Sequence, residues 1–288
     1  MADINVFENN HTLQQHPLIA SRGIVVMPGA NLSFEVVRDF SIAAINAAAK
    51  RDGLIIIASQ KDFSVEEPSA KELCDVVTIA KIVQIAKLPD GLIRVGVRGL
   101  SRGDLLKAEK KNNMFLGIVY PIVEIEAMAE SPEREALLRS LKENYGEYIS
   151  LLPKFNEEVP PAVFAEQDLG RCADQMVAGS LFAPEQRQEI LEQIDPVKRS
   201  ELLLEILVRE IEILKMEQEI HARVRESIEA NQRDYYLHEQ MRVIQDELGE
   251  GEGGDEINEY YEKVDALNAS EETKVKLRKE VDRMAKMP

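Results

Sequence analysis

The sequence predicts an α+β protein in which a compact, mostly antiparallel β-structure precedes a set of helices. Short runs rich in β-branched residues and separated by turn residues fill residues 16–127, and such runs are typical of strands. Residues 197–248 contain no glycine and no proline. A helix over this stretch, rising about 1.5 Å per residue, would reach on the order of 80 Å. Such a helix is a strut, a spacer or a coiled-coil arm rather than part of an ordinary core.

The β-structure is expected to follow a mobile tail at residues 1–15 and to contain one helix. The expected strands lie at residues 24–27, 54–57, 76–79, 82–85, 92–95 and 116–119. Residues 88–91 read Leu-Pro-Asp-Gly, and Asp-Gly tolerates the positive φ angles of a hairpin turn. Residues 41–50 are rich in alanine and precede Gly53, so they predict a helix packed on the strands.

A helical subdomain is predicted at residues 128–195. Ser131, Pro132 and Glu133 form a typical helix start, with a capping serine, proline at the first helical position and an acid in the first turn. Helices are expected at about 132–151, 162–180 and 184–194, separated by prolines. Asp195 and Pro196 repeat the start signal and open the long helix, residues 196–248.

The long helix carries an apolar stripe with steps of three and four residues. Its members are Leu207, Ile211, Ile213, Leu214, Met216, Ile220, Val224, Ile228, Leu237, Met241, Ile244 and Leu248. Towards the C-terminal end the stripe narrows to a seam that suits helix pairing or subunit contact. A flexible Gly/Glu-rich joint is expected at residues 249–254, followed at 255–288 by two helices that form a hairpin.

Composition excludes several classes of function. The 288 residues are 44% hydrophobic and 30% charged, which favours a soluble globular protein. A formal net charge of -17 would repel a phosphate backbone, so nucleic acid is an unlikely partner. No apolar run approaches the roughly 20 residues of a membrane span, and the first residues lack a secretory signal. We therefore expect a cytoplasmic protein without a membrane partner, with Cys74 and Cys172 reduced.

The motifs that resemble known chemical sites are incomplete. His238-Glu239 begins like a zinc-protease motif, but Arg242 stands where the second histidine is required. The glycines of 249–254 follow a helix and lack the Lys-Ser/Thr ending of a phosphate loop. Residues 98–103 contain two arginines and predict either an anion site or a polar turn after a strand. We expect no catalytic residue, no metal and no cofactor in this chain, which should bind, position or oligomerise.

Four blocks carry a resemblance to a known family. They are residues 17–29, 88–99, 186–195 and 231–249, and the last is the most specific, with Tyr235-Tyr-Leu-His-Glu-Gln240 at its centre. In these blocks the chain resembles the ATP-dependent Lon proteases, in the part that precedes their ATPase module. The resemblance covers the chain from about His16 to its end.

The resemblance implies a substrate-recognition and regulatory region of a hexameric, ATP-driven serine protease. It implies a β-rich pseudo-barrel, a helical subdomain and a long helix that leads to an ATPase ring. The nucleotide-binding loop, with ATP and Mg, and the serine-lysine dyad of such a parent would lie beyond Pro288. The implied partners are unfolded or damaged proteins and further copies of the parent chain. We expect this chain by itself to be a monomer or a weak oligomer.

Candidate functional residues follow from this expectation. Apolar residues near the first strand are candidates for binding exposed apolar segments, with the core as the alternative: Leu18, Ile24, Met27, Pro28 and Phe34. Tyr235, Tyr236 and Leu237 are candidates for coupling or for guiding an unfolded chain, with packing against a helix as the alternative. Met241, Ile244 and Leu248 form the predicted association seam.

Two other classes of protein remain open from the residues. One is a stand-alone, non-enzymatic substrate-binding or chaperone-like domain with a coiled-coil arm. The other is a structural coiled-coil spacer, which would leave the β-structure without a purpose. A continuing reading frame with a nucleotide-binding loop would favour the protease.

Overall fold

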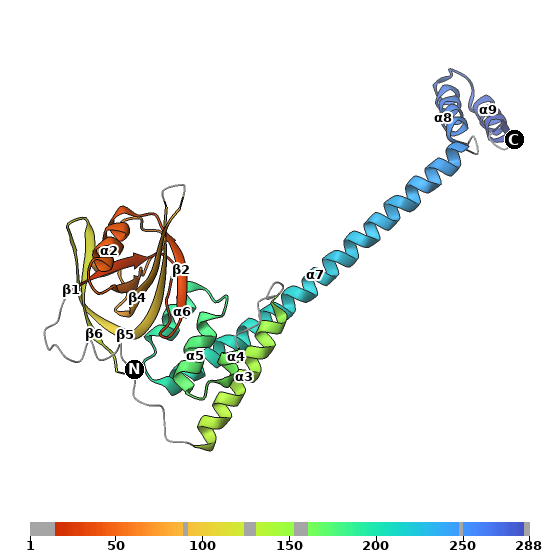
Figure 1. Cartoon of the computed structure of the whole chain (residues 1–288). Coiled ribbons are helices and arrows are strands. Elements are labelled where there is room, and N and C mark those ends of the chain that lie inside the picture. Colours follow the sequence, from red (N-terminus) through yellow and green to blue (C-terminus); the bar gives the residue numbers. More distant parts are fainter. Residues whose placement is uncertain (1–14, 89–91, 124–130, 153–160, 248–249, 285–288) are drawn as a thin grey trace. The chain divides into compact units, whose positions relative to one another are not determined.

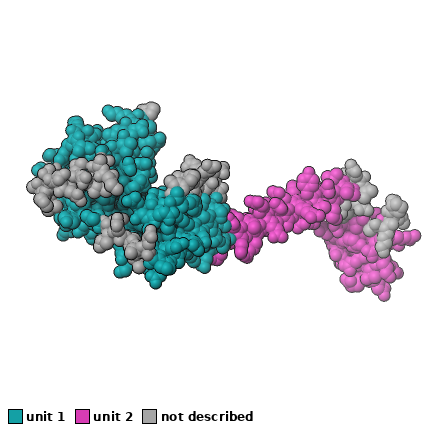
Figure 2. All heavy atoms as spheres, turned by 60° about the horizontal axis from the view of Figure 1, so that its bottom comes forward, with its two compact units in different colours: residues 1–215 teal, residues 216–288 magenta. Residues whose placement is uncertain are grey.

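The computed structural model describes residues 15–88, 92–123, 131–152, 161–247 and 250–284. The chain divides into two compact units, residues 1–215 and residues 216–288, which Figure 2 colours separately. The predicted tail, the tip of the predicted hairpin at residues 89–91, and Leu248 of the predicted seam lie outside the described residues. Gln15, which the sequence assigns to the tail, is the first residue of a strand.

The first unit contains a sheet of six strands that closes on itself (Figure 1). The strands are β1 (Gln15–Ser21), β2 (Asn31–Val36), β3 (Leu54–Ser59), β4 (Val76–Lys87), β5 (Ile93–Lys111) and β6 (Met114–Pro121). Their order is β2-β5-β4-β3-β1-β6, and a further pairing of β5 with β6 closes the barrel. Strand β5 is long enough, at 19 residues, to pair with β2, β4 and β6.

Strands β1 and β3 pair in parallel, whereas the other described pairings are antiparallel. Parallel neighbours need a crossover connection, and helix α2 (Asp39–Ala49) lies within it. Residues of β3 alternate between two core clusters: Ile56 lies in one with Phe40 and Phe115, and Ile55 in the other with Ile45. A strand buried on both faces reads as a continuous apolar run, as 54–57 does.

Residues 24–27, which the sequence predicts as a strand, do not join the sheet. Their carbonyl groups are bound instead by hydroxyl groups: Thr78 Oγ1 donates to the carbonyl of Val26 at 2.5 Å, and Ser21 Oγ donates to that of Ile24 at 2.7 Å. The segment is as apolar as a strand because it is buried. Its backbone carbonyl groups, however, accept hydrogen bonds from side-chain hydroxyls rather than from a neighbouring strand. The predicted strands at 76–79 and 82–85 form one strand, β4, with irregular pairing at two points.

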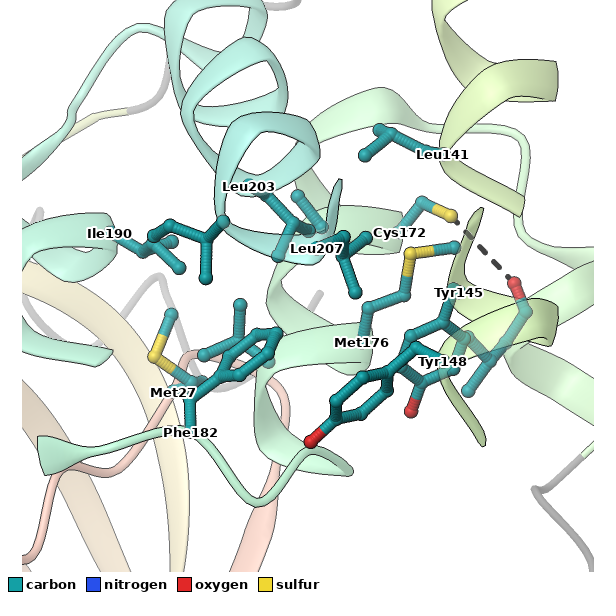
Figure 3. Packing of buried hydrophobic residues seen from close by; sticks show 14 of the residues in the cluster. Met27, Leu141, Tyr145, Tyr148, Cys172, Met176, Phe182, Ile190, Leu203 and Leu207 are labelled. Carbon is teal, nitrogen blue, oxygen red and sulfur yellow. Dashed lines mark hydrogen bonds between the residues drawn. The ribbon is translucent and has the colours of Figure 1, made fainter. Parts of the chain in front are cut away.

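The helical subdomain consists of α3 (Pro132–Leu151), α4 (Pro161–Ala165), α5 (Leu169–Ala178), α6 (Pro184–Glu192) and the start of α7. The predicted start at Ser131 is present, because its side chain accepts a hydrogen bond from the Arg134 N–H at 3.2 Å. The helix predicted at 162–180 is two helices, because the Asp168 side chain caps α5. Met27 of the β-structure belongs to the same apolar cluster as Phe182 and Ile190 (Figure 3).

Helix α7 (Pro196–Glu247) is 52 residues long, as the absence of glycine and proline predicts. It is followed by α8 (Glu250–Ala266) and α9 (Glu271–Met284). The expected joint at 249–254 is therefore misplaced, since residues 250–254 belong to α8. Within the described residues, none of the helices has the length and apolar character of a membrane span.

Candidate functional site

The substrate candidates chosen from the sequence divide into buried and partly exposed residues. Leu18 and Met27 are 0% and 1% exposed, so a ligand cannot reach them without unfolding the domain. Ile24, Pro28 and Phe34 are half-buried. Of these five residues, the three half-buried ones alone can contribute to a surface.

Several exposed or half-buried apolar side chains lie on or directly beside β2 and β4, the two strands that flank the first half of β5. Phe34, Val95 and Ile85 stand opposite each other in register across the three strands. Val95 is buried, while Ile85 remains 37% exposed. Val37 follows β2 directly and is 68% exposed, and Val83, at an irregularity of β4, is 67% exposed. We call Phe34, Val37, Val83 and Ile85 the hairpin apolar surface.

Sequence reasoning identified one of these four residues, Phe34. The sequence predicts a strand at residues 82–85 but does not indicate which of its apolar side chains are exposed. In the structure β3 stops pairing with β4 at Lys81, so the remainder of β4 has β5 as its described partner strand. The nearest signal in the sequence is Leu-Pro-Asp-Gly at residues 88–91, because it predicts a hairpin turn directly after this part of β4.

The arginines of residues 98–103 form neither an anion site nor a turn. Both lie within β5, and Arg102 is 1% exposed. Its guanidinium donates to both carboxylate oxygens of Asp174 on α5, at 2.7 and 2.6 Å. Arg199, at the start of α7, donates to the same carboxylate at 3.2 Å. A bidentate pair of this kind combines strength with fixed geometry.

The same two guanidiniums also bind the last turn of α6 and the chain between α6 and α7. Arg102 donates to the carbonyl of Leu191 at 2.9 Å. Arg199 donates to the carbonyls of Gln193 and Ile194, each at 2.9 Å. The base of the long helix is thereby attached to the β-barrel through buried hydrogen bonds, all within the first unit. The sequence carried no signal for this network, because its three charged side chains lie far apart along the chain.

The coupling candidates lie on α7 in the second unit. Tyr235 and Tyr236 are exposed, and so are Leu237, Met241 and Ile244. The packing of Tyr235 and Tyr236 against a helix, which was the alternative from the sequence, is not seen among the described residues. The roles in coupling and association stay predictions.

The two buried thiols and the buried hydroxyl of Tyr145 are held in their neutral forms. Burial raises the pKa of Cys74 and of Cys172 to about 11, and a thiol of that pKa is a poor nucleophile at neutral pH. Burial likewise raises the pKa of Tyr145 to about 12. Among the residues described, no three His, Cys, Asp or Glu side chains come together as ligands for a metal ion.

Comparison with known proteins defines the class to which this chain belongs. Residues 15–209 match the family described as the "ATP-dependent protease La (LON) substrate-binding domain". The match covers the barrel, the helical subdomain and the first part of α7. The chain therefore belongs to the Lon substrate-binding domain family.

The relatives are Lon proteases. The Lon protease of Clostridioides difficile (strain 630) is 37% identical over 286 residues, which cover 97% of this chain and 36% of the relative. Lon protease 1 of Bacillus subtilis (strain 168) is 35% identical over 277 residues, covering 94% of this chain and 35% of the relative. The chain thus spans about a third of the length of these relatives.

A solved structure supports the fold. The N-terminal domain of Mycobacterium avium complex Lon protease superposes with a TM-score of 0.54 at 22% identity, covering 69% of this chain and 98% of that domain. The resemblance found in the sequence is confirmed, and so is the α+β fold with a β-rich first part, a very long helix and C-terminal helices.

Proposed function

We propose that this chain receives unfolded polypeptides for an ATP-dependent serine protease that degrades misfolded and selected regulatory proteins. It binds exposed apolar segments and passes them to an ATPase ring that uses ATP and Mg²⁺. Membership of the Lon substrate-binding domain family supports the class of ligand. The observation that carries the proposal is the hairpin apolar surface, where Val37 and Val83 leave about two thirds of their area in water.

The size of this surface favours weak and general binding. Burying a valine or isoleucine side chain fully is worth about 1.5–3 kcal/mol. Three such residues that are one third to two thirds exposed would contribute on the order of 3–5 kcal/mol, which corresponds to a dissociation constant around the millimolar range. Several copies acting together would raise the apparent affinity by orders of magnitude. A single copy with weak affinity suits a receiver that must release its substrate.

Assembly into a parent homohexamer would supply those copies. In this proposal the exposed apolar residues Met241 and Ile244 of α7 make contacts between subunits. Together with Leu248, which lies outside the described residues, they form the association seam. Tyr235, Tyr236 and Leu237 guide the polypeptide or couple its binding to the motor. The physical support is that apolar side chains repeated at helical spacing on an exposed helix favour a partner.

The proposal is tested by a titration of the chain against one fluorescently labelled protein, presented once folded and once permanently unfolded, with anisotropy as the readout. We expect binding of the unfolded form only. Val83→Lys places a charge on the hairpin apolar surface and should weaken binding at least about threefold. Leu106→Lys is the matched control, because Leu106 is 53% exposed at a comparable irregularity in β5.

Equal binding of the folded and unfolded proteins, or of neither, contradicts the proposal. Equal loss in the two lysine variants would remove the hairpin apolar surface from it. Circular dichroism of both variants establishes that the fold is retained.

A further inference from the structure

Strand β2 is an open edge of the barrel. It stands at the end of the strand order and pairs with β5 alone among the residues that the structure describes. Residues Asn31, Ser33 and Glu35 are exposed. An edge of this kind presents unpaired N–H and C=O groups to any extended chain beside it.

The pairing pattern tells which groups are free. The Gly99 N–H donates to the carbonyl of Ala30 at 2.9 Å, and hydrogen-bonded positions alternate along an antiparallel pair. Leu32, Phe34 and Val36 therefore direct their backbone groups to β5. The intervening residues, Asn31, Ser33 and Glu35, direct their backbone groups away from β5.

The hydrogen bonds on the other side of β5 give the same alternation. The Leu88 N–H donates to the carbonyl of Leu92 at 2.8 Å.

This edge has no lysine, no proline and no bulge to block pairing. Natural edge strands carry lysine, proline or bulges, whereas β2 reads Asn-Leu-Ser-Phe-Glu-Val and pairs without irregularity over all six residues. The open part of β4 differs, because it has an irregularity between Ile82 and Gln84 and ends in Lys87. The sheet thus has a protected edge and an unprotected one.

We propose that β2 binds an extended segment of the unfolded substrate as an added strand of the barrel. This inference rests on the proposed function and names how the substrate is held. Hydrogen bonds to the backbone suit a receiver that cannot depend on sequence. A second copy of this chain, with a net charge of -17 on each copy, is disfavoured at this edge by repulsion unless contacts elsewhere hold the copies together.

The two faces of β2 define the preferred substrate. Side chains of an added strand alternate between the faces. On one face they would lie beside the half-buried Phe34. On the other they would lie beside Ser33 and the ion pair of Glu35 with Arg94, in which Arg94 Nη2 lies 2.5 Å from Glu35 Oε1. The preferred segment has about six residues with apolar side chains at every second position.

The test uses synthetic peptides of this pattern and fluorescence anisotropy. N-methylation of alternate residues removes the N–H donors from one edge of a peptide and leaves its side chains unchanged. We prepare two forms, methylated on either edge. Methylation of the edge that faces β2 should weaken binding at least about tenfold, because it removes several backbone hydrogen bonds at once. Methylation of the other edge should change it by less than about threefold.

Two variants of the protein complete the test. Ser33→Pro removes an outward N–H without touching the pairing with β5 and should abolish peptide binding. Ser33→Ala removes the hydroxyl, keeps the N–H, and should bind as the unchanged chain does. Because the methylated peptides leave the protein unaltered, they decide the question even if the proline variant does not fold.

The outcomes separate this inference from the proposed function. Binding of the unmethylated peptide that is weakened equally by methylation of either edge, or by neither, overturns the added strand and leaves the receiver role intact. Failure of both the peptide and the unfolded protein to bind contradicts the proposed function itself. Light scattering that shows a dimer of the unchanged chain, lost in Ser33→Pro, would assign the edge to a second copy and overturn the inference.

Discussion

Replacing Asp174 by asparagine should destabilise the first unit more than any single change on its surface. The side chain keeps its shape, but the guanidiniums of Arg102 and Arg199 lose the carboxylate that both contact at 2.6–3.2 Å. Both arginine side chains are 0% exposed. Breaking a buried ion pair by removing one partner costs about 3–5 kcal/mol, because it leaves charge uncompensated in a medium of low polarity.

The assay is urea unfolding followed by circular dichroism. With a slope of about 2–3 kcal/mol per molar urea, this loss lowers the midpoint by about 1–2 M. Glu205→Gln is the control, because it also removes one carboxylate from an arginine pair, Arg209 at 2.9 Å, but on the surface. That pair is worth only about 0.3–0.5 kcal/mol. Equal midpoints for the two variants would refute the reasoning that burial gives the Asp174 contacts their weight.

Three further outcomes are expected in the same assay. Gly99→Ala should destabilise by about 2 kcal/mol or more, because its Cβ would lie 2.3 Å from the carbonyl oxygen of Met27; full stability would contradict that contact. Gly146→Ala should stabilise α3 by about 1 kcal/mol, since nothing lies within 4 Å of the added Cβ. Burial raises the pKa of Cys172 from 9.0 to about 11 and of Tyr145 from 10.0 to about 12, so their contribution to stability is complete below pH 9 and is lost through pH 11 and 12. A midpoint unchanged over that range would show that these groups ionise freely.

The helices were the most predictable part of the fold, because their signals are local. Ser131 and Pro132 mark the start of α3, and the lack of glycine and proline predicts α7. The prediction of a joint in the Gly/Glu-rich segment was wrong, because glycines near the start of a helix do not prevent the helix from forming. Glycine costs only about 1 kcal/mol in a helix, and the start of α8 at Glu250 accommodates it.

The barrel was less predictable, because strand pairing depends on residues distant in sequence. Residues 24–27 look like a strand and are held by the hydroxyls of Thr78 and Ser21. The burial of Arg102 follows from Asp174, which lies 72 residues away. The candidate site was the least predictable part. The exposure of Val83 and Ile85 depends on where β3 stops pairing with β4, and this cannot be read from the residues of β4 alone.

The pairing of β1 has a consequence for how the chain folds as it is synthesised. Of the described strands, β1 is the first to emerge from the ribosome, but it is held by β3 and by β6, which ends at Pro121. Until β6 has emerged, the apolar side chains of β1 lack one of their two neighbours, and contacts of such long sequence separation form slowly. The nascent chain thus passes through a stage in which it displays the unpaired apolar strands that mark an unfolded protein.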